Sequence, residues 1–254
     1  MINRREFCSA LVGTLFLSKS VFNGTSADLF LAREYKNARG LTMPYRLFVP
    51  EGYDKRKQYP LVLWLHGGAG RGRDNLKQIT GGNTSGSHVW TRPANQSQHP
   101  CLVVAPQCPE GEQWTTYDQV TITGQMRLAL EIIADLQRTF SIDAGRLYVT
   151  GQSMGGFGTW AVISERPNMF AAAVPVCGGG DETKASRLVR TPVWAFHGEK
   201  DEAVSVERSR SMIAAIKKAG GSPKYTEYGG AGHVIWDQVF SEPDLLPWVF
   251  TQRA

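Results

Sequence analysis

The hydrophobic pattern of the chain changes near residue 57. Before it, residues 29–36 and 43–49 are two apolar segments joined by Ala38-Arg39-Gly40, which predicts a β-hairpin. After it, continuous apolar runs alternate with segments of helical spacing. Such runs are typical of strands buried on both faces, and we expect them at residues 61–65, 102–105, 147–150, 171–176, 193–196 and 224–228. This order predicts an α/β fold with a mostly parallel, eight-stranded sheet.

Helices are expected between these strands and on both faces of the sheet. The apolar stripe of the first consists of Met126, Ala129, Leu130, Ile133, Leu136 and Phe140. A second helix spans about 206–219 and ends at Gly220-Gly221, and a short last helix should begin one turn before Pro247. Residues 67–100 are rich in Gly, Asn, Ser and His, which predicts a long irregular loop that shapes a binding site.

Composition limits the classes of protein that remain. A chain of 254 residues with 42% hydrophobic and 20% charged residues is typical of one globular domain. The formal charge of +5 is spread along the chain without a long Lys/Arg block, which argues against a nucleic-acid partner. No Cys/His spacing indicates a metal site.

The N-terminus has the order of an export signal. The pair Arg4-Arg5 precedes an apolar stretch, residues 7–17, and then small residues. The pattern is similar to a twin-arginine signal, with cleavage expected after Ala27, and predicts a periplasmic or secreted protein. We therefore divide the chain into a signal, 1–27, and a catalytic domain, 28–254. The apolar stretch is short for a membrane span; an amphipathic helix or an uncleaved anchor is the alternative.

Three cysteines follow the signal, an odd number that cannot all pair. Cys101 and Cys108 lie at opposite ends of one predicted strand, roughly 20 Å apart, so they should not form a disulfide. A bond between Cys108 and Cys177 is geometrically conceivable, but free buried thiols are expected.

Gly151-Gln152-Ser153-Met154-Gly155 matches the G-x-S-x-G pattern of a nucleophile elbow. The five residues alone are weak support, because a chain this rich in glycine contains the pattern by chance about 0.2 times. Their context is more specific: a buried strand precedes Ser153 and a helix, residues 157–163, can follow it. Such a turn holds the serine hydroxyl at the N-terminus of the helix and predicts a nucleophile.

A serine nucleophile needs a histidine base oriented by an acid, and in this type of fold the order along the chain is Ser, acid, His. Asp201 follows one predicted strand and His233 the next, so both should lie at the same sheet edge as Ser153. Glu199 and Asp181 compete with Asp201 for the acid position.

Glycines after the strand at 61–65 let backbone N–H groups approach a substrate carbonyl. We assign the oxyanion hole to the N–H groups of Met154 and Gly68, with Ala69 as the alternative to Gly68. Neither a G-x-G-x-x-G nor a P-loop pattern is present, which disfavours nucleotide binding.

Other histidines and tryptophans receive different interpretations. His66 and His197 each precede a glycine at a strand end and are expected to be structural hydrogen-bonding residues. Trp114 and Trp236 are candidates for the rim of a substrate site, whereas Trp160 is expected in the core.

With these residues identified, the chain resembles the lidless esterase branch of the α/β-hydrolase superfamily. That branch is similar to feruloyl and acetylxylan esterases, polyhydroxybutyrate depolymerases and the catalytic domain of prolyl oligopeptidases. The resemblance is carried by the segments YRLFVPEGYDKRKQYPLVLWLHGGAGRGRDN, APQCPEGEQW, RLYVTGQSMGGFGTW, WAFHGEKDEAVSVERS and GAGHVIWD.

The resemblance implies hydrolysis of a small or polymer-linked ester by Ser153, Asp201 and His233, without a cofactor and without a separate lid domain. A serine peptidase is the alternative, although the chain leaves no room for the large N-terminal propeller of prolyl oligopeptidases. A non-catalytic binding module is a further alternative. The sequence does not define the oligomeric state.

Overall fold

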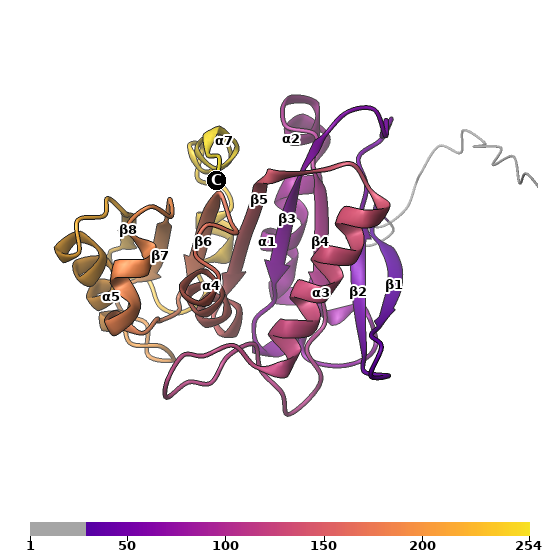
Figure 1. Ribbon diagram of the computed structural model, residues 1–254. Helices are drawn as coiled ribbons and strands as arrows, with labels where there is room; N and C mark the ends of the chain where they lie inside the picture. Colours follow the sequence, from indigo (N-terminus) through magenta and orange to yellow (C-terminus); the bar gives the residue numbers. More distant parts are fainter. Residues whose placement is uncertain (1–28) are drawn as a thin grey trace, which may run out of the picture.

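The computed structural model describes residues 29–254, so the predicted export signal lies outside the described residues. Its centre is a single eight-stranded sheet with the strand order β1-β2-β4-β3-β5-β6-β7-β8 (Figure 1). The strands are β1 (Leu31–Lys36), β2 (Thr42–Phe48), β3 (Tyr59–Leu65), β4 (Leu102–Pro106), β5 (Ile142–Gln152), β6 (Ala172–Val176), β7 (Trp194–Gly198) and β8 (Lys224–Tyr228). The eight predicted strands are therefore confirmed.

Two strand pairings are antiparallel and the rest are parallel. The β1–β2 hairpin pairs Leu31 with Leu47, and β2 joins the sheet antiparallel to β4. From β4 to β8 every pairing is parallel. All carboxyl ends of β3, β5, β6, β7 and β8 consequently meet at one edge, where ligand sites in open α/β sheets form.

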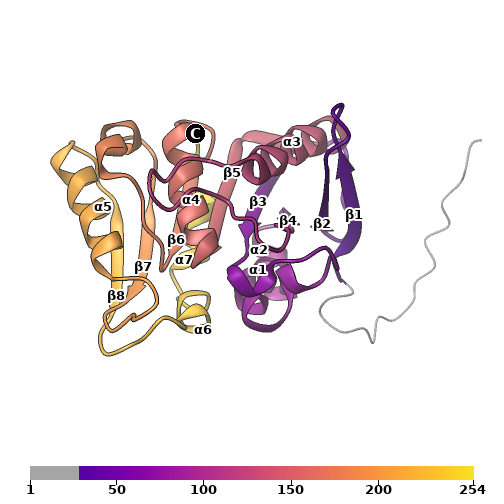
Figure 2. The same ribbon diagram turned by 90° about the horizontal axis from the view of Figure 1, so that it is seen from below.

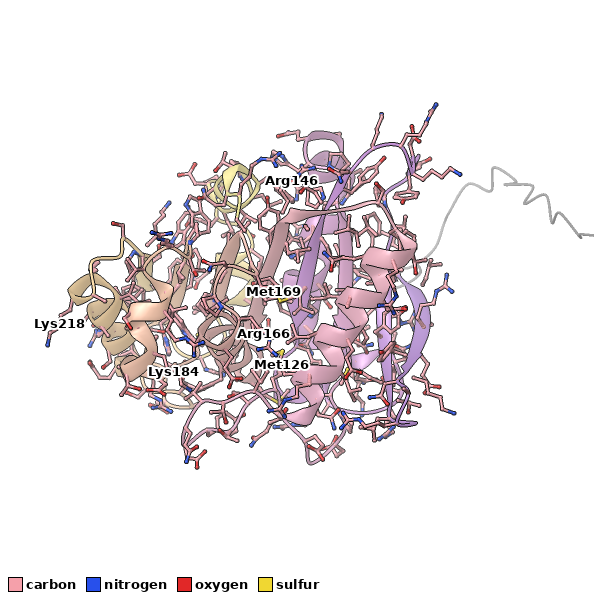
Figure 3. All side chains as sticks on the ribbon, in the orientation of Figure 1. Met126, Arg146, Arg166, Met169, Lys184 and Lys218 are labelled. Carbon is pink, nitrogen blue, oxygen red and sulfur yellow. The ribbon has the colours of Figure 1, made fainter. Side chains whose placement is uncertain are left out.

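Helices cover both faces of the sheet (Figure 2). The helices are α1 (Thr84–His88), α2 (Pro93–Gln98), α3 (Gly124–Thr139), α4 (Met154–Glu165), α5 (Glu207–Lys218), α6 (Trp236–Val239) and α7 (Leu245–Thr251). One face packs against α3, α4 and α5, with Met126 and Met169 among the side chains that fill it (Figure 3). The other packs against α6 and α7 and the aromatic side chains of Phe30 and Trp90. The fold is an α/β-hydrolase fold without a separate lid domain within residues 29–254.

The prediction of an irregular loop over residues 67–100 is wrong. This segment consists of α1, α2 and short 3-10 helices at Gly68–Gly70, Lys77–Ile79, Gly81–Asn83 and Val89–Thr91. Three of its large apolar side chains, Ile79, Val89 and Trp90, are buried against the sheet, whereas Leu76 is exposed. The polar residues between them satisfy the backbone locally; Ser87 Oγ, for example, donates to the Asn83 carbonyl at 2.8 Å.

Two smaller expectations also have answers in the structure. Cys101, Cys108 and Cys177 are free and buried, as predicted. Among residues 29–254, the helices are all too short or too polar to cross a membrane.

Candidate active site

Ser153 lies on the turn between β5 and α4, at the carboxyl edge of the sheet. Its backbone has φ 54° and ψ −116°, outside the regions that a serine normally occupies. The Ser153 N–H donates to the Val176 carbonyl at 2.8 Å, which ties the turn to the neighbouring β6. The strained strand-to-helix turn that the sequence predicts is present.

The glycines beside Ser153 are required by close backbone contacts. A Cβ on Gly155 would lie 1.9 Å from the Leu65 carbonyl oxygen, and one on Gly151 would lie 2.5 Å from the Gly155 oxygen. Neither obstacle is a flexible side chain. The G-x-S-x-G spacing therefore lets α4 approach β3 and β5 closely enough to place Ser153 above the sheet edge.

The structure brings together Ser153, His233 and Asp201. His233 Nε2 lies 2.9 Å from Ser153 Oγ, and His233 Nδ1 lies 2.6 Å from Asp201 Oδ2. The side chain of Asp201 is fully buried, whereas that of His233 is 22% exposed. A carboxylate can only accept here, so Nδ1 carries a hydrogen and Nε2 is free to accept the Ser153 proton.

Asp201 is held as a carboxylate by donors on both oxygens. Its Oδ1 accepts from the N–H groups of Ala203 at 2.9 Å and Val204 at 2.8 Å. Burial raises the pKa of Asp201, but the hydrogen bonds from Val204 and His233 outweigh it and hold the pKa below its usual value. The acid therefore stays ionised at neutral pH.

The two competing acids lie elsewhere. Glu199 accepts from the Gly230 N–H at 2.7 Å. Asp181 caps the 3-10 helix Glu182–Leu188 and forms an ion pair with Lys184 at 3.2 Å. Only Asp201 of the three contacts His233.

The predicted oxyanion donors begin two helices at the same edge. Met154 is the first residue of α4, and Gly68 is the first residue of the 3-10 helix Gly68–Gly70. Within residues 29–254, neither N–H group donates to an acceptor of the chain, whereas the Gly67 N–H donates to Asn83 Oδ1 at 3.0 Å. Their role as oxyanion donors stays a prediction.

A cavity of about 430 Å³ opens beside Ser153 and His233. Its other lining residues are Tyr117, Met154, Phe157, Ala203, Val204, Ser205 and Arg208. Arg208 packs over the Phe157 ring, 5.4 Å from its centroid, and donates from Nη2 to the Tyr117 carbonyl at 3.3 Å. The cavity therefore offers an aromatic wall and one permanent positive charge to a ligand. Sequence reasoning missed Tyr117, Phe157 and Arg208, because nothing in the pattern around them indicates which side of their segment faces the cavity.

All three tryptophans are buried, so neither Trp114 nor Trp236 lies on an exposed substrate rim as predicted. Trp114 is fully buried and donates from Nε1 to the His66 carbonyl, so its assignment to the rim is wrong. Trp236 is 8% exposed and packs edge-on against the His233 ring at 5.2 Å, where it supports the imidazole. Trp160 lies in the core, as predicted.

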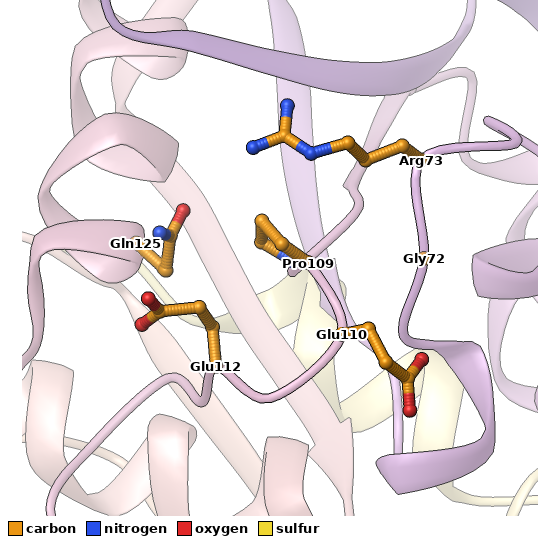
Figure 4. A pocket seen from close by; sticks show the side chains of 6 residues that line it. All are labelled: Gly72, Arg73, Pro109, Glu110, Glu112 and Gln125. Atoms are coloured by element: carbon orange, nitrogen blue, oxygen red, sulfur yellow. The ribbon is translucent and has the colours of Figure 1, made fainter.

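A second cavity, of about 300 Å³, is lined partly by charged and amide side chains (Figure 4). Its lining residues are Gly72, Arg73, Pro109, Glu110, Glu112 and Gln125. These residues include neither a serine or cysteine nor a histidine, so the serine chemistry lies with the first cavity.

Comparison with known protein families gives a match to this chain. The model of the dienelactone hydrolase family matches residues 110–238, which is just over half of the chain and includes Ser153, Asp201 and His233. The chain belongs to the dienelactone hydrolase family.

The relatives that this chain matches include esterases. It is 27% identical over 181 residues to a bifunctional acetylxylan esterase/xylanase of Neocallimastix patriciarum, covering 71% of this chain and 24% of that protein. It is 29% identical to acetylxylan esterase A of Aspergillus oryzae, covering 57% of this chain and 50% of the relative. The crystal structure of a thermostable esterase superposes with a TM-score of 0.87 at 38% identity, covering 90% of this chain and 64% of that one. The chain thus spans less than two thirds of these proteins.

Proposed function

We propose that this protein is an exported serine esterase that cleaves carboxylic esters through an acyl-enzyme on Ser153. The observation that carries the proposal is the hydrogen-bonded series Ser153, His233 and Asp201, of which Ser153 and His233 line a cavity. A hydroxyl 2.9 Å from an imidazole that a buried carboxylate orients is the arrangement that acyl transfer requires.

The mechanism follows from the protons in this series. His233 Nε2 takes the Ser153 proton as Oγ attacks the ester carbonyl, and the N–H groups of Met154 and Gly68 stabilise the developing oxyanion. The imidazolium then donates its proton to the leaving alcohol. Water attacks the acyl-enzyme in the same way, with His233 again as base. Asp201 keeps His233 in the tautomer that leaves Nε2 free.

The substrate class is inferred from the relatives. Acetylxylan esterases act on esters attached to a polysaccharide, as their names state. A cavity that is open beside the nucleophile, in a fold without a lid domain, suits an ester carried on a polymer. The twin-arginine-like N-terminus supports export of the protein. Export also suits a polymeric substrate, because such a substrate does not cross membranes and must be met outside the cell.

The first test is substitution of the nucleophile. Ser153→Ala should lower kcat/KM for p-nitrophenyl acetate by roughly ten thousand-fold or more, because both halves of the reaction need Oγ. Ser97→Ala, on the exposed side of α2, should retain wild-type activity. Fluorophosphonate should label the wild type and not Ser153→Ala. Retained activity in folded Ser153→Ala would overturn the proposal, and an unlabelled, inactive wild type would favour a non-catalytic binding module.

The second test is a substrate panel. Acetylated xylan, feruloyl esters, hydroxybutyrate oligomers and proline-containing peptide substrates should be compared at equal enzyme concentration. We expect ester hydrolysis to exceed peptide hydrolysis by several orders of magnitude. Peptide cleavage at a rate equal to that of the esters would instead support a serine peptidase.

A further inference from the structure

His197 is a buried histidine that contacts the acid of the site without contacting Ser153. It lies near the end of β7 and its side chain is fully buried. Its Nε2 lies 2.9 Å from the Val204 carbonyl and 3.2 Å from Asp201 Oδ2. Asp201 Oδ2 is the same oxygen that faces His233 Nδ1 at 2.6 Å, so two histidines meet on one carboxylate oxygen.

The surroundings of His197 determine its tautomer. The Val204 carbonyl and the Asp201 carboxylate can only accept, so Nε2 carries a hydrogen and donates to both. The other ring nitrogen, Nδ1, lies 2.7 Å from Ser209 Oγ, which also lies 3.2 Å from the Gly178 carbonyl. With Nε2 protonated and the ring neutral, Nδ1 is an acceptor, and the single hydroxyl hydrogen is shared between it and that carbonyl. Burial lowers the pKa of His197, which keeps the ring neutral. His197 is therefore a fixed neutral donor to the acid.

The Asp201 carboxylate is saturated by this arrangement. Oδ1 accepts from two backbone N–H groups, and Oδ2 accepts from His233 and His197. His197 also links the acid to the cavity, because Val204 donates its N–H to Asp201, accepts from His197 with its carbonyl, and lines the cavity beside Ser153.

Other ionisable groups face this cluster from the neighbouring elements. The Cys177 thiol, after β6, lies within 4.8 Å of ligand atoms of Asp201 and His233. Arg208 on α5 lines the same cavity. Glu227 on β8 is paired with His197 in the sheet, and its hydrogen bond from Arg210 lowers its pKa. A thiol is a weak hydrogen-bond donor, so Cys177 competes poorly for Asp201. After His233, His197 is therefore the main side-chain donor to Oδ2.

We propose that His197 is a positioning residue of the triad, which holds the Asp201 carboxylate against His233 and limits the attraction of Oδ2 for the proton of His233. The inference rests on the proposed esterase function for its kinetic consequence, whereas the contact itself can be measured in the resting protein. When the His197 N–H is removed, Oδ2 becomes more basic and stabilises the His233 imidazolium more strongly. The carboxylate also gains freedom to turn.

The test compares two substitutions of similar size that differ in one hydrogen bond. His197→Gln keeps an N–H donor that can reach the position of Nε2, whereas His197→Met has none. In His197→Met we expect kcat for p-nitrophenyl acetate to fall about 10- to 100-fold with little change in KM, because misplacement of the acid disturbs the reacting geometry. When kcat/KM is plotted against pH, the rise on the acidic side of this variant's profile should move to higher pH by about half to one unit. His197→Gln should retain most of kcat and the dependence of kcat/KM on pH that the wild type has.

Controls separate positioning from simple loss of stability. His99→Gln and His99→Met change a histidine that stacks on Phe250, remote from the triad, and should leave the profile unchanged. If His197→Met and His197→Gln lose kcat equally, or if the rise on the acidic side of the profile does not move in His197→Met, His197 is only a structural residue and the proposal is wrong.

A second readout does not depend on turnover or on the Met variant. The Nδ1–H resonance of His233, which reports its hydrogen bond to Asp201 Oδ2, can be followed by NMR in the wild type and in Ser209→Ala, which removes the hydroxyl that orients His197. This resonance should shift in Ser209→Ala, because Oδ2 loses a competing donor, and an unchanged resonance would overturn the proposal. If Ser153→Ala retained esterase activity, the proposed function would fail, but this measurement would still decide whether His197 acts on Asp201.

Discussion

At the scale of single residues, the chemistry of this protein depends on imidazoles kept neutral by burial. His66 is fully buried at the end of β3; its Nδ1–H donates to the Gly67 carbonyl and its Nε2 accepts from the Cys108 N–H. Burial lowers the pKa of His66 from 6.5 to about 4. Its predicted structural role is confirmed by these contacts.

This pKa predicts how stability depends on pH. Between pH 6.5 and about 4 the unfolded chain binds a proton at residue 66 that the folded chain excludes, so the free energy of unfolding should fall as pH falls through this window. By pH 4, this effect of His66 should have lowered the free energy of unfolding by about 3 kcal/mol. In His66→Gln, which keeps an acceptor for the Cys108 N–H, this loss of stability at low pH should be absent, because glutamine does not bind a proton in this range. Urea unfolding at pH 7 and pH 4 should show the stability gap between wild type and variant narrowing by that amount, and a constant gap would contradict the prediction.

At the scale of elements, α4 is a helix whose glycines permit contact rather than flexibility. A Cβ on Gly158 would lie 2.7 Å from Trp114 Cβ and 3.2 Å from a terminal carbon of Met126. Gly158→Ala should therefore lower the free energy of unfolding by about 1–3 kcal/mol despite the higher helix propensity of alanine. Gly124, the first residue of α3, has open space at its Cβ position, so Gly124→Ala should be neutral or stabilising by up to about 1 kcal/mol. Urea unfolding of both variants checks the opposite signs, and equal effects would contradict them.

Elements were predictable from sequence where one local pattern determines them. Strands such as β3 and β4 are uninterrupted apolar runs, and the elbow at Ser153 has its glycines at fixed positions. The helices of residues 67–100 were not predictable from the sequence, because Ile79, Val89 and Trp90 are too widely spaced to give a helical period. Side-chain hydrogen bonds, such as that of Ser87, hold these helices instead. The rim prediction for Trp114 failed for a related reason: it lies in a polar segment, and tertiary contacts with α4 and His66 bury it.

At the scale of the whole molecule, the sheet edge explains why three residues of the site could be predicted and the cavity could not. Chain order and parallel strands bring Ser153, Asp201 and His233 to one edge in any fold of this type. The cavity wall, in contrast, combines Tyr117 from a loop with Arg208 from α5, and their approach depends on how separate layers pack.

The predicted domain boundary at residue 28 can be tested on the same scale. Phe30 is 2% exposed, packs against Phe48, and its carbonyl accepts from Arg46 Nη1 at 2.9 Å, whereas Leu31 is 47% exposed. Cleavage after Ala27 retains Phe30, so a chain of residues 28–254 should unfold at the same temperature as the full chain. A chain of residues 31–254 loses this buried ring at a cost of about 3 kcal/mol or more, which corresponds to a Tm lower by roughly 6–12 °C. In the 28–254 chain, Phe30→Ala should reproduce that loss and Leu31→Ala should not. Equal Tm values for the 28–254 and 31–254 chains would mean that the domain begins after Phe30.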